Sequence, residues 1–352
     1  MMMINSRAAG SQGRRLHFVG TLPQFDTAAA AFAAQTGQLH GEIRRLSGGE
    51  TGPRLSWFVP LVKELKAGPK VTARQEGDWS DYDDVDRLAV RRGHRLTPGD
   101  IPLHLAEWAE EELDALQAAG TPATAERPLQ VGVPSYLDLA LFIFGPIGAL
   151  RWAGVFLDAV TAQVERMVAH AGNRVVIQIE TPAAAIAVAS MPSSLQRRAA
   201  DALGGLVLRQ VRRAPQGARL GMHLCVGDMG HKARVRPSSV APLVRLTNVL
   251  ARRWPDGRTL EFVHIPLCGG EEPPTTDPTF YAPLRELDIA PNTTLVAGLA
   301  HEGATVEDQR AVRDLVERET GMEVDIATAC GLGRRSREQA ESAVERMRAL
   351  LS

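Results

Sequence analysis

Segments with the composition of β-strands recur along the whole chain, and most are separated by stretches with helical periodicity. Most of these segments are continuous apolar runs rather than alternations, which is typical of strands covered on both faces. Repeated strand–helix pairs indicate an α/β protein with a parallel sheet, and eight of them predict a single (β/α)8 TIM barrel. A doubly wound open sheet is the alternative. The expected strands are 17–21, 42–47, 129–134, 175–180, 219–225, 259–265, 294–299 and 323–328.

Two helices towards the carboxyl end have clear start signals. Thr305 with Asp308, and Ser336 with Gln339, have the spacing of capping boxes, and an apolar stripe follows each pair. By contrast, the region 70–128 is long and charged, and its pattern predicts no definite order of elements.

Charge and composition narrow the classes of function. The 352-residue chain has 40 basic and 41 acidic side chains, and only 5% of its residues are aromatic. Balanced charge and few stacking platforms argue against nucleic-acid binding or attachment to an anionic membrane. The longest apolar stretch, 139–150, is interrupted by glycine and proline and is shorter than the roughly 20 residues of a membrane span. We therefore expect no nucleic-acid partner and no membrane.

The first residues differ from the rest of the chain. Residues 1–14 are polar, end in two arginines and lack the apolar centre of a secretory signal. We expect a disordered segment over 1–14, one barrel domain over 15–352, and a cytoplasmic location. Three cysteines are too few for a disulfide framework.

Chemistry-bearing residues gather at the ends of the predicted strands. In a TIM barrel the active site lies where strands end and loops begin, so these residues belong to one ring. The ring contains three histidines, two cysteines and two carboxylates. Its members are Gly20, Thr21, Glu50, Ser135, Glu180, His223, Cys225, His264, His301 and Cys330.

Part of this ring has the character of a metal site. His223 and Cys225 are two residues apart at a strand end, so both side chains face the same way. Cys330 closes the last strand, His264 closes a strand between them, and Glu261 lies earlier in that strand. Two thiolates with imidazole or carboxylate suit Zn²⁺. The alternative is a set of buried structural side chains, because cysteine is among the most buried residue types.

Six motifs at these strand ends follow one another in a recognisable order. The chain resembles the catalytic barrel of cobalamin-independent methionine synthase, within the superfamily shared with uroporphyrinogen decarboxylase. The matching segments are VGTLPQ at 19–24 (family TIGSFPQ), GETGPR at 49–54 (HGExxR), IQIETPA at 177–183 (IQIDEPA), MHLC at 222–225 (HMC), GLAH at 298–301 (YDIH) and ACGL at 329–332 (DCGL).

The resemblance implies a zinc-activated thiol as methyl acceptor. In the family, zinc is held by the His-x-Cys pair, a glutamate and a late cysteine. His223, Cys225 and Cys330 fall on three of these positions. The family glutamate ends a strand, and here that end falls nearest His264. Glu261 is the alternative, but it requires a three-residue register shift that reverses its face.

The resemblance also implies roles for the rest of the ring. His301 corresponds to the residue that supplies a proton to the leaving group. Gly20, Thr21, Glu50 and Glu180 occupy the places that recognise an amino-acid substrate. Carboxylates there would pair with an ammonium group, and backbone N–H groups with a carboxylate.

Two departures leave the substrates open. The family's Asp-Glu pair is Glu180-Thr181 here, which changes the pocket, so homocysteine is not secured as the acceptor. The long methionine synthases carry a second barrel that contributes to the folate site, and this chain has the length of one. The methyl donor is therefore a folate, a smaller molecule or a corrinoid protein.

The sequence predicts a zinc-dependent transferase that moves a methyl or other alkyl group to a small, amino-acid-like thiol. One alternative is a metal-free lyase or decarboxylase of the same superfamily, which would need an arginine cluster for an acidic substrate. The other is a barrel that binds a small ligand without catalysis.

Overall fold

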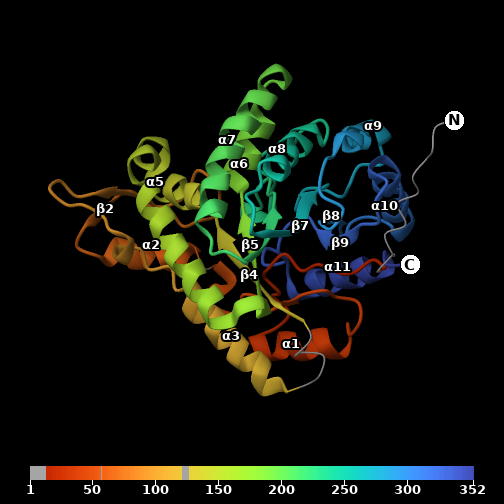
Figure 1. Cartoon of the computed structure of the whole chain (residues 1–352), viewed down its shortest axis with the longest axis horizontal. Coiled ribbons are helices and arrows are strands. Elements are labelled where there is room, and N and C mark those ends of the chain that lie inside the picture. Colours follow the sequence, from red (N-terminus) through yellow and green to blue (C-terminus); the bar gives the residue numbers. More distant parts are fainter. Residues whose placement is uncertain (1–12, 57, 121–126) are drawn as a thin grey trace.

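A curved sheet of seven strands forms the centre of the molecule, and helices lie around its outside (Figure 1). The computed structural model describes residues 13–56, 58–120 and 127–352. The strand order is β1-β4-β5-β6-β7-β8-β9, and each neighbouring pair is parallel. These strands are β1 (Leu46–Ser47), β4 (Leu129–Pro134), β5 (Val175–Glu180), β6 (Arg219–His223), β7 (Thr259–Pro266), β8 (Thr294–Ala300) and β9 (Asp325–Thr328).

Helices connect the strands and bury their apolar faces against the sheet. Thr305 and Ser336 cap α10 and α11 as predicted, since their hydroxyls accept from the backbone N–H groups of Asp308 and Gln339. The helices are α1 (Ala28–Gly37), α2 (Phe58–Ala67), α3 (Leu105–Ala119), α5 (Tyr136–Ala171), α6 (Pro182–Ser190), α7 (Ser193–Arg213), α8 (Ala241–Arg252), α9 (Pro278–Tyr281), α10 (Val306–Thr320) and α11 (Arg337–Ala349).

The barrel prediction is confirmed in part. The described strands form a parallel sheet of seven rather than eight. The segment expected as the first strand, 17–21, is not a strand. Instead Leu16 makes single parallel bridges to Ile43, next to one edge of the sheet, and to Ile326 in the strand at the other edge. Leu16 therefore contacts both sides of the gap in the sheet, where a full strand was expected.

Other expected strands are shorter in the structure. β6 stops at His223, so Cys225 lies just past the strand rather than in it. The strand expected over 42–47 is reduced to Leu46–Ser47. The domain limits expected at 1–14 and 15–352 stay a prediction, because residues 1–12 lie outside the described part of the chain.

The charged region 70–128 contains an antiparallel hairpin that the sequence pattern did not predict. Its strands are β2 (Val71–Gln75) and β3 (Arg87–Val90), which pair with each other in a separate sheet. Their exposed faces carry polar side chains, so the hydrophobic signal is short and weak. The hairpin loop contributes Trp79 and Tyr82 to the walls of the cavities described below.

One helix is apolar over an unusual length. The segment Tyr136–Arg174 is long and apolar enough to cross a membrane by length and composition alone, and a third of its most apolar window (33%) is buried. Gly145, with φ 67° and ψ 179°, and Pro146 interrupt the helical geometry within α5. The part before this break packs beside the site, where Phe142 lines a cavity wall.

The register brings the functional ends of the strands to one edge of the sheet. Pro134 pairs with Glu180, Glu180 with His223, and His223 with His264. Side chains at these levels project together at the carboxyl end of the sheet, which is where TIM-barrel chemistry occurs.

Candidate functional site

Three possible metal ligands converge at this edge. The ligand atoms of His223, Cys225 and Cys330 all lie within 4.8 Å of one another. The two Sγ atoms are 3.8 Å apart, and the Sγ of Cys330 is 3.7 Å from Nε2 of His223. His223 and Cys225 are buried, and Cys330 is half-buried. The predicted convergence of these side chains is therefore found in the structure.

The spacing of these atoms fits tetrahedral zinc. Zn–S bonds of about 2.3 Å at tetrahedral angles place two sulfurs about 3.8 Å apart, and a Zn–N bond of about 2.05 Å places nitrogen about 3.6 Å from sulfur. The observed 3.8 Å and 3.7 Å match these edges. The hydrogen bond with Cys225, followed by burial, raises the pKa of the Cys330 thiol well above its ordinary value. A cation between the sulfurs would reverse this shift and stabilise the thiolates.

The hydrogen bonds around His223 leave the correct ring nitrogen free for a metal. Nε2 of His264 donates to the carbonyl oxygen of Thr328 at 2.9 Å, so Nδ1 of His264 is an acceptor. Nδ1 of His223 lies 2.7 Å from that acceptor and must carry its proton. The lone pair of His223 is then on Nε2, which faces Cys330. Burial, and then the neighbouring His264, lower the pKa of His223 well below its ordinary value, which keeps the ring neutral and able to ligate.

The two residues considered for a fourth ligand occupy different places. His264 stands level with His223 but lies outside the group of converging ligand atoms, because its ring nitrogens contact His223 and Thr328. Glu261 lies towards the amino end of β7 and forms ion pairs with Arg219 and Arg45. Glu261 therefore points to the opposite end of the sheet from Cys225.

A cavity of about 220 Å³ opens above the two cysteines. Its lining includes several residues predicted from the strand ends, among them Gly20, Thr21, Glu50, Glu180, Cys225 and Cys330. Arg334 is the single arginine among the described residues that line this cavity. An acidic substrate with several negative charges therefore lacks partners here.

Two half-buried carboxylates, Glu50 and Glu180, line this cavity. An added Cβ on Gly132 would lie 3.0 Å from Oε1 of Glu180 and 3.2 Å from Oε1 of Glu50, so both carboxylates approach the same glycine. The hydroxyl of Thr21 donates to Oε2 of Glu50 at 2.5 Å. Burial, and then the charge of Glu50, raise the pKa of Glu180 to about 8. Burial also raises the pKa of Glu50. The pair needs a cation, such as an ammonium group, to hold two negative charges.

The backbone of this loop is held in a sparsely populated conformation. Glu50 has φ 45°, and the preceding Gly49 has φ 78°. A non-glycine residue in the left-handed region costs about 1–3 kcal/mol and persists where the surrounding structure enforces it. With this backbone conformation, the Glu50 side chain lines the cavity.

An apolar annex of about 170 Å³ adjoins the cavity and was not predicted. Phe58, Trp79 and Phe142 line it, together with Met229. Asp138 also lines the annex, and its Oδ2 is buried without a hydrogen-bond partner among the described residues. Nε1 of Trp79 is likewise buried without a partner there. No local sequence pattern indicates the annex, because it is formed between α5 and a hairpin loop whose position depends on tertiary structure.

His301 lies near the site but its ring is occupied by backbone partners. Nε2 of His301 donates to the carbonyl oxygen of Gly270 at 2.9 Å, and Nδ1 accepts from the N–H of Gly303 at 2.9 Å. His301 is not among the described residues that line the main cavity. Burial lowers the pKa of His301 and favours the neutral ring.

Comparisons with solved structures now define the class of this fold. No protein-family model matches the chain, and neither does any curated protein. Over nearly all of its length the chain shares the fold of structures of methionine synthase and methyltransferase type. A B12-independent methionine synthase from Shewanella sp. W3-18-1, in complex with selenomethionine, is similar with a TM-score of 0.62 and 14% identity, over 96% of this chain and 97% of that one.

A second solved structure, a methyltransferase from Methanosarcina mazei, has a TM-score of 0.50 and 13% identity, over 97% of this chain and 95% of that one. The resemblance predicted from the sequence is thereby confirmed at the level of the fold. At these identities the likeness extends to architecture, and the chemistry has to be argued from the site itself.

Proposed function

We propose that this protein is a zinc-dependent transferase that moves a methyl or other alkyl group to a thiol. The observation that carries the proposal is the convergence of His223, Cys225 and Cys330, whose two cysteines line a substrate-sized cavity and lie at distances that suit tetrahedral zinc, Cys225–Cys330 and Cys330–His223. Zinc held by these three residues would have a fourth position open to a thiol and would lower the pKa of that thiol. The similar solved structures are of a methionine synthase and a methyltransferase, which agrees with this chemistry.

His264 is proposed here to orient a ligand rather than to complete the set. Its hydrogen bond fixes the tautomer of His223, and such partners raise metal affinity and align the ring. Glu50 and Glu180 would bind the ammonium group of an amino-acid-like thiol. The pair would orient the sulfur towards the two cysteines, since all four residues line one cavity.

The annex provides a place for the non-reacting part of the methyl donor. Its aromatic walls, with Phe58, Trp79 and Phe142, suit a flat apolar group, while Arg334 at the boundary with the main cavity suits a single negative charge. A small donor or the end of a larger one would fit. His301 stays a candidate proton donor by resemblance, although its ring would have to leave Gly270 to act.

The main alternative in the superfamily is a metal-free lyase or decarboxylase. Acidic substrates of such an enzyme require several cationic side chains, and the described lining of the main cavity has one. The carboxylates of Glu50 and Glu180 would repel an acidic substrate. The charges of the cavity therefore favour the transferase.

The test combines metal analysis with X-ray absorption at the zinc edge. We expect one zinc per chain in the wild type, and one additional sulfur in its coordination shell after homocysteine or 2-mercaptoethanol is added. Cys225→Ser should lose zinc, whereas the matched variant Cys268→Ser should keep it, because Cys268 donates to the carbonyl oxygen of Gly298 outside the cluster. Full zinc content and full turnover in Cys225→Ser would refute the proposal.

A further inference from the structure

Asp228 occupies a position in the cavity that the proposed function leaves without a role. It lies in the loop that follows β6 and lines the same cavity as Cys225 and Cys330. Its side chain is 9% exposed, and among the described residues its Oδ1 has no hydrogen-bond partner. A buried carboxylate oxygen without a partner is energetically costly, so its presence beside the proposed metal site points to a function.

His231 lies next to Asp228 and is not among the described residues that line the cavity. Its Nδ1 is 3.7 Å from Oδ1 of Asp228 and is also buried without a partner in the described part of the chain. The His231 side chain is 23% exposed, so it reaches towards solvent. A small shift of either side chain would bring the two atoms within hydrogen-bond distance.

The backbone holds this pair together. The N–H of His231 donates to the carbonyl oxygen of Asp228 at 3.1 Å, and His231 has φ 61°, in the left-handed region. An added Cβ on Gly270 would lie 2.0 Å from Oδ1 of Asp228 and 3.1 Å from Nδ1 of His231. A side chain at position 270 would therefore occupy the space beside these two atoms, and glycine leaves it free.

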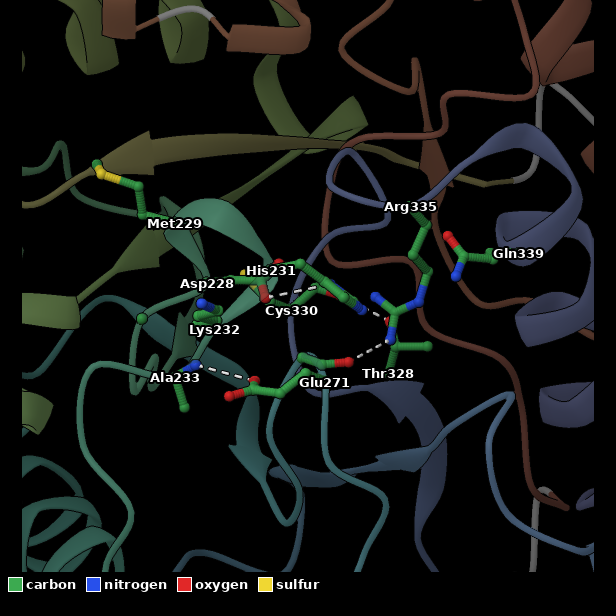
Figure 2. A network of polar contacts seen from close by, with 12 residues as sticks. Asp228, Met229, His231, Lys232, Ala233, Glu271, Thr328, Cys330, Arg335 and Gln339 are labelled. Carbon is green, nitrogen blue, oxygen red and sulfur yellow. Dashed lines mark hydrogen bonds and ion pairs between the residues drawn. The ribbon is translucent and has the colours of Figure 1, made fainter. Parts of the chain in front are cut away.

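Burial and the neighbouring charges act in opposite directions on the Asp228 carboxyl. Burial raises the pKa of Asp228 to about 7, while the positive charges of Arg335 and Arg334 oppose this shift. Arg335 is largely compensated, since its Nε contacts both carboxylate oxygens of Glu302 at 2.9 and 3.0 Å. The titratable and charged groups around Asp228 are Tyr82, His231, Glu271, Glu302, Cys330, Arg334 and Arg335. Figure 2 labels four of them, His231, Glu271, Cys330 and Arg335.

We propose that Asp228, with His231 next to it, is the pair that transfers protons in this cavity. The role rests on the proposed function, whose overall reaction is R–SH + CH3–X giving R–S–CH3 + H–X. Asp228 would accept the thiol proton as the S–H bond breaks, leaving the electron pair on sulfur. When sulfur takes the methyl group and the C–X bond breaks, Asp228 would return that proton to X. Between turnovers, His231 would re-equilibrate Asp228 with protons from solvent.

This assignment differs from the one implied by the family resemblance. His301 would serve there as the acid, but its two ring nitrogens are bonded to the backbone of Gly270 and Gly303. Asp228 lines the cavity, and its Oδ1 has no hydrogen-bond partner among the described residues, so it can take a proton without breaking an existing hydrogen bond.

The experiment counts protons rather than turnovers. Homocysteine is added to the zinc-loaded full-length protein, and calorimetry in buffers of different ionisation enthalpy gives the protons released per thiol bound. A thiol that becomes a thiolate releases about one proton. We expect the wild type to release clearly less than one, because the thiol proton passes to Asp228 and stays in the cavity, and Asp228→Asn to release about one.

Three further variants make the outcome decisive. His231→Gln should shift the pH at which retention is lost, because the neighbouring ring no longer responds to pH. Glu112→Gln should release as few protons as the wild type, although burial raises the pKa of Glu112 to about 7, since Glu112 is paired with Arg54 in an adjoining pocket. Equal release by wild type and Asp228→Asn at equal zinc content would overturn the proposal. The proposal would also be overturned if His301→Gln released about one proton per thiol bound while Asp228→Asn released none.

The failure of the proposed function gives a different result. If neither homocysteine nor 2-mercaptoethanol binds to the zinc-loaded wild type, and no sulfur enters the zinc shell, then the transferase and the role of Asp228 fall together. If the thiol binds but the proton count is unchanged by Asp228→Asn, only the role of Asp228 is refuted.

Discussion

The Sγ atoms of Cys225 and Cys330 lie 3.8 Å apart although 105 residues separate them in the chain. Cys225 follows β6 and Cys330 follows β9, and the parallel strands end at the same edge of the sheet. The distance equals the sulfur–sulfur edge of a tetrahedral zinc site with Zn–S bonds of about 2.3 Å. The proposed chemistry depends on this pair.

The hydrogen bond between His264 and His223 leads to a prediction about metal affinity. His264→Ala should weaken zinc binding by about 10- to 100-fold, because His223 loses the partner that fixes its tautomer and orientation. Glu261→Ala should leave zinc affinity unchanged, since Glu261 is paired with Arg219 at the opposite end of β7. Competition with a chromophoric chelator measures both. If only Glu261→Ala weakened zinc binding, Glu261 rather than His264 would be the residue that acts at the metal.

The raised pKa of Glu180 predicts how stability changes with pH. The folded state holds a proton on Glu180 up to about pH 8, whereas an unfolded carboxyl releases it near its ordinary value of 4.5. The free energy of unfolding therefore falls as the pH rises from 4.5 to 8, by at most about 1.4 kcal/mol for each pH unit. Glu180→Gln should lose less stability than the wild type between pH 5 and 8. Urea unfolding across this range tests it, and parallel curves would contradict it.

The space beside Gly132 predicts how the site selects an ammonium group. Gly132→Ala places a methyl group 3.0 Å from Glu180 and 3.2 Å from Glu50, which should separate the carboxylates. We expect homocysteine to bind roughly 10-fold more weakly, with little change for 4-mercaptobutyrate, which lacks the amine. Calorimetry on the zinc-loaded protein measures both. Gly154→Ala is the matched control, because its Cβ meets nothing within 4 Å. Equal losses for the two thiols would exclude an ammonium subsite.

The environment of Cys268 predicts its reactivity. Burial raises the pKa of its thiol to about 12, so almost no thiolate is present at neutral pH. We expect Cys268 to resist iodoacetamide at pH 7.5 in the folded protein and to react once urea unfolds it, because the thiolate is the nucleophile. Mass spectrometry of peptides after timed labelling gives the rates. Rapid modification of Cys268 in the native state would show that the loop opens.

The sequence alone determined those features that are encoded locally. Apolar runs separated by helical patterns are sufficient to predict parallel strands, so β4, β5, β7 and β8 fall close to their expected positions. His223, Cys225 and Cys330 could be singled out because strand ends in parallel α/β folds meet at one edge. The hydroxyl caps of α10 and α11 were also predictable, since they depend on residues three apart.

Tertiary structure decided what depends on contacts between distant segments. Leu16 bridges both sides of the sheet because the sheet curves, which no local pattern records. The tautomer of His223 is set by His264 and Thr328, each from a different strand, and the pairing of Asp228 with His231 requires the room left by Gly270. Periodicity reports which face of an element is buried, but a proton position or an orphaned oxygen is fixed only by which atoms finally come within a few ångströms of each other.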